Sequence, residues 1–315
     1  MIGDQGVRLT PDDDGFHTPT SADPMWSETT WFSFSVPQRR LHAYVYPWVR
    51  PNMAMFGGGV MVWDADGHLP WDCVHWNYQW NLPMPELGDL RDFEFPLGIR
   101  VRSLEPLADY HITYDHPDCS IDVTFRALME PHVVGRGDPP GLFSAHVDQP
   151  GHVSGRLVLR GEAIPVDCYA IRDRSWGPRI EDPGLRMGYD HAQRGDAAFL
   201  AFSSPGAVPD HEAAPLTPGL GYLWRDGEAA ALRVGTRTVE RDGPWPRRVV
   251  VRATDALDRN LEAVGDCVNR IAFTNIPWMF NWVSLTRWQF AEGEGWGEDQ
   301  DVWHIDRYRA FVRDR

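Results

Sequence analysis

Hydrophobic and polar residues alternate along much of this chain, and the alternation predicts strands. Between residues 119 and 128 an apolar side chain occupies every second position, which is the period of a half-buried strand. The turn sequences Asp-Ala-Asp-Gly at 64–67 and Arg-Asp-Gly-Glu at 225–228 predict hairpins. A short helix is expected only over residues 255–265. Further strands, rich in aromatic and β-branched residues, are expected at 30–36, 41–46, 59–63, 71–80 and 110–114.

The strand pattern breaks at residues 135–150, which are rich in glycine and proline. A fresh series of strands then follows, at 155–159, 164–171, 187–192, 198–203, 221–224, 230–234, 248–253 and 282–290. Residues 204–219, with four prolines, are expected to form a long loop. Frequent turns between short strands are typical of sandwiches and barrels. We therefore expect an all-β protein with two units of similar size, residues 1–145 and 146–315.

Composition and charge narrow the class of protein. The 315 residues are 43% hydrophobic and 24% charged, which is ordinary for a globular chain. The formal net charge of −15 disfavours binding to nucleic acid and to anionic lipid. The first residues contain no apolar leader, and no apolar run approaches the ~18 residues of a membrane helix. We expect a cytoplasmic protein without membrane insertion.

Two residue types exclude several chemistries. All 30 basic residues are arginine, so a Schiff-base lysine, a pyridoxal-phosphate lysine and a P-loop are absent. The four cysteines form no CxxC pair, and buried thiols are expected instead of a zinc knuckle or a disulfide framework. A nucleophile elbow, a dinucleotide loop and a His-Glu-x-x-His motif are also missing. We expect no cofactor and no metal; His111 with His116 is a weak alternative.

Tryptophan is abundant, with 15 copies, several of them in clusters. Alternation over residues 71–80 places Trp76, Tyr78 and Trp80 on one face and His75 on the other. Such indoles either pack a core or line a cavity, as in an eight-stranded barrel that encloses one ligand. Indole faces also stabilise cations, by ~2 kcal/mol when desolvated. The second interpretation makes a hydrophobic small molecule the expected partner, and its candidate binding residues are Trp71, His75, Trp76, Tyr78 and Trp282.

The most distinctive string covers residues 166–179. A strand at 166–171 is followed by the charged triplet Arg172-Asp173-Arg174 and by Trp176-Gly177-Pro178. A carboxyl between two guanidiniums and beside an indole, at a barrel mouth or between two barrels, could act as a general acid or base. The arginines would lower its pKa and apolar walls would raise it. Equally, Asp173 could pin a loop through an ion pair with Arg172, Arg174 or Arg179.

This string resembles the Asp-His-x-Trp-Gly signature of the carotenoid 1,2-hydratase (hydroxyneurosporene synthase) or AttH-like superfamily, and in particular uncharacterised bacterial members with Arg-Asp-His-Ser-Trp-Gly-Pro-Arg. Phe16-His17, residues 186–191 and residues 295–298 match as well, so the resemblance spans most of the chain. It implies two consecutive lipocalin-like (calycin-like) β-barrels, with the motif in the second. The family's aspartate, tryptophan and glycine fall on Asp173, Trp176 and Gly177.

The family histidine falls on Arg174, and an arginine cannot shuttle protons near neutral pH. His191, on a strand expected shortly after the motif, is a candidate replacement because it titrates in the useful range. It could equally be a hydrogen-bonded strand histidine.

The resemblance and the residues together favour a cofactor-independent hydratase, dehydratase or isomerase acting on an apolar, terpenoid- or steroid-like molecule. Asp173 would be the acid, Trp176 would stabilise a cation beside Arg172 and Arg174, and Tyr189 or His191 would orient water. A lipophilic carrier without chemistry and a pericyclase-like cyclase that only preorganises its substrate are the alternatives. The oligomeric state is open, with a homodimer as one option.

Overall fold

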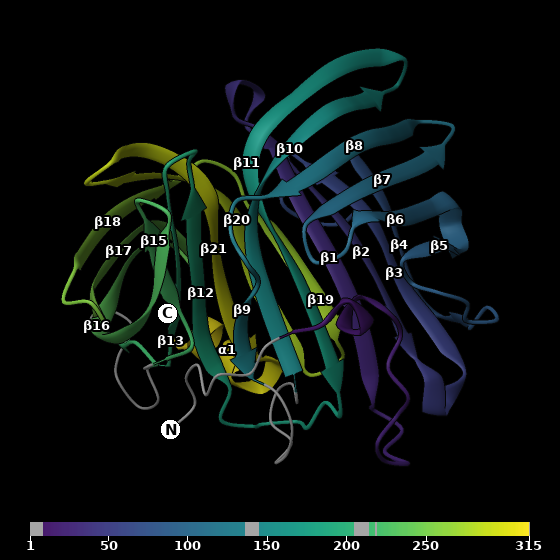
Figure 1. The fold of residues 1–315 in the computed structure, drawn as a ribbon. Helices are drawn as coiled ribbons and strands as arrows, with labels where there is room; N and C mark the ends of the chain where they lie inside the picture. Colours follow the sequence, from purple (N-terminus) through teal and green to yellow (C-terminus); the bar gives the residue numbers. More distant parts are fainter. Residues whose placement is uncertain (1–8, 136–144, 205–213, 218, 315) are drawn as a thin grey trace.

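The structure, a computed structural model, describes residues 9–135, 145–204, 214–217 and 219–314. It is all-β and consists of two curved units that lie side by side (Figure 1). The second unit is a closed eight-stranded barrel, and the first is a sheet curled into a half-barrel. The expected pair of lipocalin-like barrels is therefore confirmed. No helix in the described part of the chain is long and apolar enough to cross a membrane.

The first unit is built on one antiparallel sheet of eleven strands within the described residues, in the order β4-β3-β2-β1-β11-β10-β8-β7-β6-β5, with β9 beside β10. Its strands are β1 (Ser27–Val36), β2 (Leu41–Arg50), β3 (Met55–Trp63), β4 (His75–Pro83), β5 (Asp92–Phe95), β6 (Ile99–Glu105), β7 (Asp109–His116), β8 (Cys119–Ala127), β9 (His132–Gly135), β10 (Ala145–Leu159) and β11 (Glu162–Gly177). The 3-10 helices of this unit are η1 (Pro11–Asp14), η2 (Pro37–Arg39), η3 (Pro51–Met53) and η4 (Pro96–Gly98).

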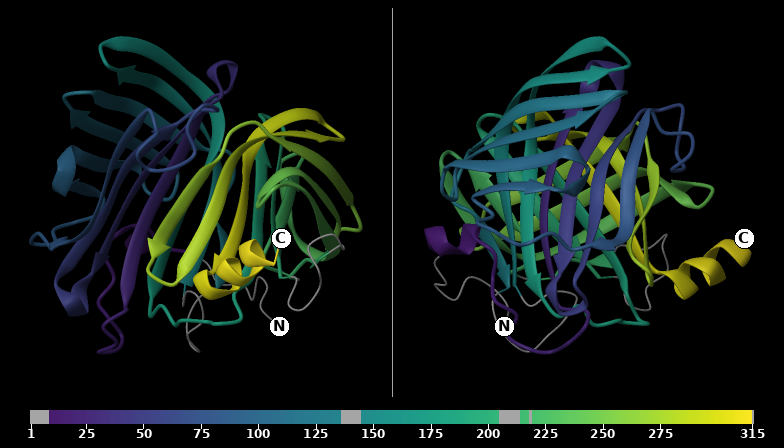
Figure 2. Two further views of the ribbon diagram at one scale, coloured as in Figure 1. Left: turned by 180° about the vertical axis from the view of Figure 1, so that it is seen from behind. Right: turned by 90° about the vertical axis from the view of Figure 1, so that its right-hand side faces the viewer.

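The strand order of the second unit is β16-β15-β13-β12-β21-β20-β18-β17, and the barrel closes because β16 also pairs with β17. In addition, β14 pairs with β16, and β19 pairs with β20. Figure 2 shows α1 beside this barrel. The elements are β12 (Arg186–Gln193), β13 (Ala197–Ser203), β14 (Ala214–Pro215), β15 (Tyr222–Arg225), β16 (Glu228–Asp242), β17 (Trp245–Asp255), β18 (Asn260–Cys267), β19 (Ile271–Ile276), β20 (Met279–Phe290), β21 (Gly293–His304) and α1 (Ile305–Arg313).

The division between the two sheets lies later in the chain than the expected boundary between residues 145 and 146. β10 and β11 belong to the first sheet, because β11 pairs with β1 and β10 pairs with β8. The motif around Asp173 is thus part of the first unit, and the chain enters the second sheet only at β12. The glycines and prolines at 135–150 suggested an interruption, but β10 continues through Pro150; residues 136–144 lie outside the described residues.

Most expected strands are confirmed, although the strand expected over residues 71–80 begins only at His75, and the expected helix is wrong. β8 buries Ile121, Val123 and Phe125 on one face, and Arg225 pairs with Glu228 across a two-residue turn. The helix expected over residues 255–265 is instead a turn and the strand β18. That segment keeps a period of two, since Leu261 is buried and Glu262 is exposed, and paired strands on both sides satisfy its backbone.

Some strands are buried on both faces, and β2 shows why. Leu41, Ala43 and Val45 point into the core of the first unit, whereas Tyr44 and Trp48 pack in a cluster shared with the second unit. Small aliphatic residues thus alternate with aromatic and polar ones. The second set forms the face on which the two units meet.

Two groups of side chains occupy the interior of the closed barrel. One part is an apolar cluster that includes Phe199 and Trp288. The other part is ionic: Arg237 contacts Asp190 at 2.8 Å and also pairs with Asp299. The cavity that contains Asp173 lies between the two units, one of the two positions expected for it.

Candidate functional site

A cavity opens between the two units and encloses about 750 Å³ of space free of atoms, part of it open to solvent. From the first unit it is lined by Ser27, Thr29, Tyr46, Trp48, Arg50, His146, Asp173, Ser175 and Arg179, and from the second by Met187, Tyr189, Phe202, Asn275, Ile276, Met279, Asn281, Gln300 and Val302.

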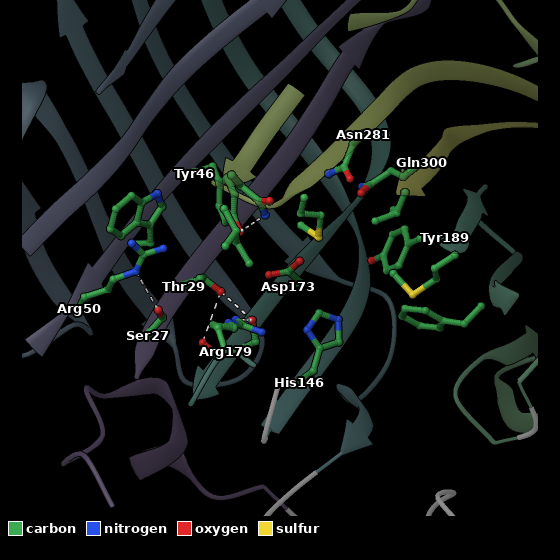
Figure 3. Close-up of a pocket in the computed structure, with 18 residues that line it drawn as sticks. Ser27, Thr29, Tyr46, Arg50, His146, Asp173, Arg179, Tyr189, Asn281 and Gln300 are labelled. Atoms are coloured by element: carbon green, nitrogen blue, oxygen red, sulfur yellow. Dashed lines mark hydrogen bonds between the residues drawn. The ribbon is translucent and has the colours of Figure 1, made fainter. Parts of the chain in front are cut away.

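Asp173 lies near the middle of this lining, with His146 and Tyr189 on one side and Arg50 on the other (Figure 3). Its place follows from register. β10 and β11 pair so that Asp148 is opposite Asp173 and His146 is opposite Ser175. Directly opposed residues of antiparallel strands project from the same face. Two carboxyls and an imidazole from neighbouring strands are therefore brought together at the cavity.

Hydrogen bonds order this acidic side of the cavity. The hydroxyl of Tyr189 donates to Oδ1 of Asp148 at 2.5 Å, and Nε2 of His146 lies 3.0 Å from Oδ2 of Asp148. Asp148 is fully buried. Since Tyr189 comes from β12 and the other two from β10, this carboxylate also links the two units.

Burial and neighbouring charges shift the pKa values of Asp173 and His146. The pKa of Asp173 is raised from 3.8 to about 7, mainly by burial; the charges of His146 and Arg179 oppose the rise, and those of Asp148 and Glu298 add to it. Burial lowers the pKa of His146, but Asp148 and Asp173 outweigh this, so the pKa lies above its ordinary value of 6.5. Near neutral pH a proton can thus reside on either Asp173 or His146.

The opposite side of the cavity is cationic. Nε of Arg50 donates to Oγ of Ser27 at 3.3 Å, and its guanidinium lies 4.5 Å from the centre of the Trp48 ring. Nη2 of Arg179 donates to Oγ of Ser175 at 2.5 Å. Burial lowers the pKa of both guanidiniums, and arginine remains charged at neutral pH.

Tyr46 contributes a neutral phenol to the same wall. Its hydroxyl accepts a hydrogen bond from Nδ2 of Asn275 at 3.1 Å. Burial is the main cause that raises its pKa to about 12, with the charge of Asp173 adding to the rise. Tyr46 is therefore a hydroxyl donor at neutral pH, not a base.

The neighbours of Asp173 in the motif do not line this cavity. β11 continues to Gly177, so Arg172, Arg174 and Trp176 point to the face opposite Asp173. Nε of Arg172 donates to Gln149 at 2.7 Å, Arg174 pairs with Glu28, and Trp176 stacks on a histidine ring with centroids 4.0 Å apart. These three predicted site residues are separated from Asp173 because the strand does not end at residue 171.

The aromatic candidates are also mostly elsewhere. Trp71 is 80% exposed and lies in the turn before β4. Nε2 of His75 contacts the Tyr114 hydroxyl at 2.9 Å within the first unit, and burial lowers the pKa of His75 to about 4. Trp282 donates its indole N–H to Tyr308 at 2.9 Å. These three do not line the cavity.

Three further candidates lie near the cavity but behind its wall. Tyr78 accepts a hydrogen bond from the indole of Trp48 at 2.9 Å and so supports a lining residue. Trp76 packs against the same inter-unit cluster. His191 lies 3.7 Å from Oε1 of Glu298. Of the predicted site residues, Asp173 and Tyr189 line the cavity.

Sequence reasoning missed His146, Tyr46 and Arg50, although a signal was present for each. His146 and Asp148 have the i, i+2 spacing that puts both on one face of a strand, but the surrounding residues were interpreted as a break. In β2, every second residue from His42 to Arg50 is polar or aromatic. The aliphatic face of this strand packs in the core of the first unit, so these positions face the second unit.

His146, Asp148 and Asp173 could also hold a divalent cation, since one ligand atom from each lies within 4.8 Å of the others. A histidine with two carboxylates suits several such ions. Both oxygens of Asp148 already face Tyr189 or His146, and Arg179 places a positive charge near Asp173. The arrangement is better suited to proton transfer.

Comparisons with known proteins bear on the family and the fold. The model of a family described as a domain of unknown function (DUF7064) matches residues 10–299. An AttH-like protein from Nitrosomonas europaea has a similar structure, with TM-score 0.61, 16% identity, and coverage of 94% of this chain and 97% of that one. No curated protein sequence matches the chain.

Two further solved structures are similar. Kievitone hydratase from Nectria haematococca has TM-score 0.53 and 12% identity over 91% of this chain and 90% of its own. CghA has TM-score 0.53 and 13% identity over 97% of each chain. Together with the AttH-like protein, they show that this chain shares the fold of these three proteins.

Proposed function

This chain belongs to the DUF7064 family, and we propose that it is an acid–base enzyme, a hydratase, dehydratase or isomerase, that acts on a terpenoid- or steroid-like molecule between its two units. The observation that carries the proposal is the placement of Asp173 beside His146 on the cavity wall. A carboxyl whose pKa is about 7 is a competent proton donor at neutral pH. The likeness to kievitone hydratase supports the reaction class.

In the proposed hydration, protonated Asp173 gives its proton to one alkene carbon. A C–H bond forms, the π bond breaks, and the neighbouring carbon becomes a cation that the ring of Tyr46 stabilises. Water adds to this cation and releases its proton to neutral His146. The proton then returns from His146 to Asp173, so that one water has been added. Dehydration is the reverse; in isomerisation the cation loses a different proton.

Asp148 and Tyr189 are positioning residues in this scheme. Asp148 holds the imidazole of His146 through Nε2, which stabilises the cationic form of the base after it takes a proton. Tyr189 keeps a neutral hydroxyl, since burial holds its pKa well above the ordinary value of 10.0. Its hydroxyl can orient the incoming water. His146 thus takes the role that was expected of His191.

Deuterium incorporation tests the proposal without knowledge of the natural substrate. Purified protein is incubated in D2O with a panel of terpenoid alkenes, and the recovered molecules are analysed by mass spectrometry. We expect deuterium on carbon, a mass gain of one heavy water, or both. Asp173→Asn should reduce the rate by about a hundred-fold or more, and Asp167→Asn, which changes an exposed carboxyl on the same strand, should not.

Other outcomes would point to the two alternatives. Saturable binding without deuterium incorporation or product would indicate a carrier. A product of unchanged mass without deuterium, formed equally well by Asp173→Asn, would indicate a pericyclase-like cyclase. For an acid with this pKa, the hydration rate should fall as pH rises above about 7, because Asp173 loses its proton.

A further inference from the structure

Arg50 is a buried cation that lines the cavity without a carboxylate partner. Arg50 is the last residue of β2 and is 5% exposed. Its side chain makes one hydrogen bond, to Ser27, and also contacts the Trp48 ring. Within the residues that the structure describes, no acidic group forms an ion pair with it, and the groups that oppose the lowering of its pKa by burial are the phenols of Tyr78 and Tyr46. Most buried arginines of this chain differ: Arg174, Arg186 and Arg237 each pair with a carboxylate.

A buried guanidinium without a counter-ion is costly, because it has left water and gained no opposite charge. Arg50 can present its terminal N–H groups as a planar fork, which matches an oxygen anion. Ser27 and Trp48, its two contacts, line the same cavity. Arg179, on the same side as Arg50, adds a second positive charge (Figure 3).

We propose that Arg50 binds an anionic oxygen group of the ligand, so that the molecule in this cavity is an amphipath with an acidic head and an apolar skeleton. The acidic head is a carboxylate or an acidic enol or phenol. This inference rests on the proposed function and narrows it. The head group bound at Arg50 would orient the skeleton, and the reacting double bond would then face Asp173.

A pair of probes that differ only in charge tests the inference. Calorimetric titration compares 2-naphthoate with its uncharged amide, 2-naphthamide, on the whole chain. We expect the wild-type protein to bind 2-naphthoate about ten- to a hundred-fold more tightly. Arg50→Gln should remove that preference and leave 2-naphthamide binding unchanged, whereas Arg50→Lys should keep part of it.

The control is Arg39→Gln, which removes an exposed arginine that pairs with Glu162 and should change neither affinity. Equal affinities of the two probes for the wild type, a failure of both to bind, or an equal loss of both in Arg50→Gln would overturn the inference. The comparison on the wild type needs no variant to fold. Because the readout is binding, charge preference without deuterium incorporation would refute only the proposed function, and turnover without charge preference would refute only this inference.

Discussion

Asp173 and its two arginine neighbours show how one strand separates side chains that are adjacent in sequence. Arg172 and Arg174 satisfy Gln149 and Glu28 on one face of β11, while Asp173 meets His146 on the other. The arginines therefore do not neutralise the carboxyl. Its raised pKa follows from burial among further carboxylates, which can be read only from the assembled neighbours.

This environment makes a prediction about stability. Between pH 3.8 and about 7, folded Asp173 holds a proton that the unfolded chain has released, so the free energy of unfolding falls as pH rises through that window. Each pKa unit corresponds to about 1.4 kcal/mol, so Asp173→Asn should stabilise the protein by up to roughly 4 kcal/mol at about pH 8. The gain should vanish toward about pH 4.

Urea unfolding across this pH range measures the difference. Asp167→Asn, on the same strand but exposed, should give no such pH-dependent gain. If Asp173→Asn were instead less stable than the wild type at high pH, this would show that the surroundings stabilise the Asp173 carboxylate more than its raised pKa indicates.

At the scale of elements, strands buried on both faces explain why the site was only partly visible. β2 presents aliphatic residues to the core of the first unit and a polar and aromatic row, from His42 to Arg50, to the second. Pattern analysis recognised the strand. It could not assign the second face, because a row of aromatic residues is compatible with core, cavity or interface.

The barrel strand β16 carries a prediction at this scale. Arg237 contacts Asp190, Asp299 and Asp301 inside the closed barrel. Removing one partner of a buried pair leaves the others uncompensated, at a cost of about 3–5 kcal/mol. Arg237→Ala should therefore lower the free energy of unfolding by roughly that amount.

Arg252 offers a matched control on the neighbouring strand β17. It pairs with Glu262, and both side chains are well exposed. Exposed pairs are worth about 0–1 kcal/mol, so Arg252→Ala should have little effect in the same denaturant titration. Similar losses in the two variants would contradict a special role for the buried network.

At the scale of the whole molecule, a buried glutamate joins the two units. Oε1 of Glu298, on β21, lies 2.8 Å from Nε2 of His42, and its other oxygen accepts from the hydroxyl of Tyr44. Both partners belong to β2. Burial raises the pKa of Glu298, but His42 and His191 lower it by more, so it stays well below the ordinary value of 4.5.

A carboxylate with a depressed pKa contributes stability that is present above its unfolded pKa and is lost as pH falls below it. Glu298→Gln should therefore reduce the free energy of unfolding by about 3 kcal/mol at neutral pH. The difference in the free energy of unfolding between this variant and the wild type should become smaller below pH 4.5. Glu162→Gln, which alters an exposed pair with Arg39, serves as the control in chemical denaturation at both pH values; a gap independent of pH would contradict the role of the charge.

The sequence by itself determined the all-β class and most strands, because period two and turn residues act locally, and it singled out Asp173 and Tyr189, which both line the cavity. The chain passes from the first sheet to the second only after Gly177. This depends on which strands pair, and strand pairing is determined by contacts between residues far apart in the sequence. The cavity depends on it as well. His146 comes beside Asp173 through the register of β10 and β11, and Arg50 faces the same space because two curved sheets pack against each other. Burial and charge act through space, so only the tertiary structure decided which side chains share a site.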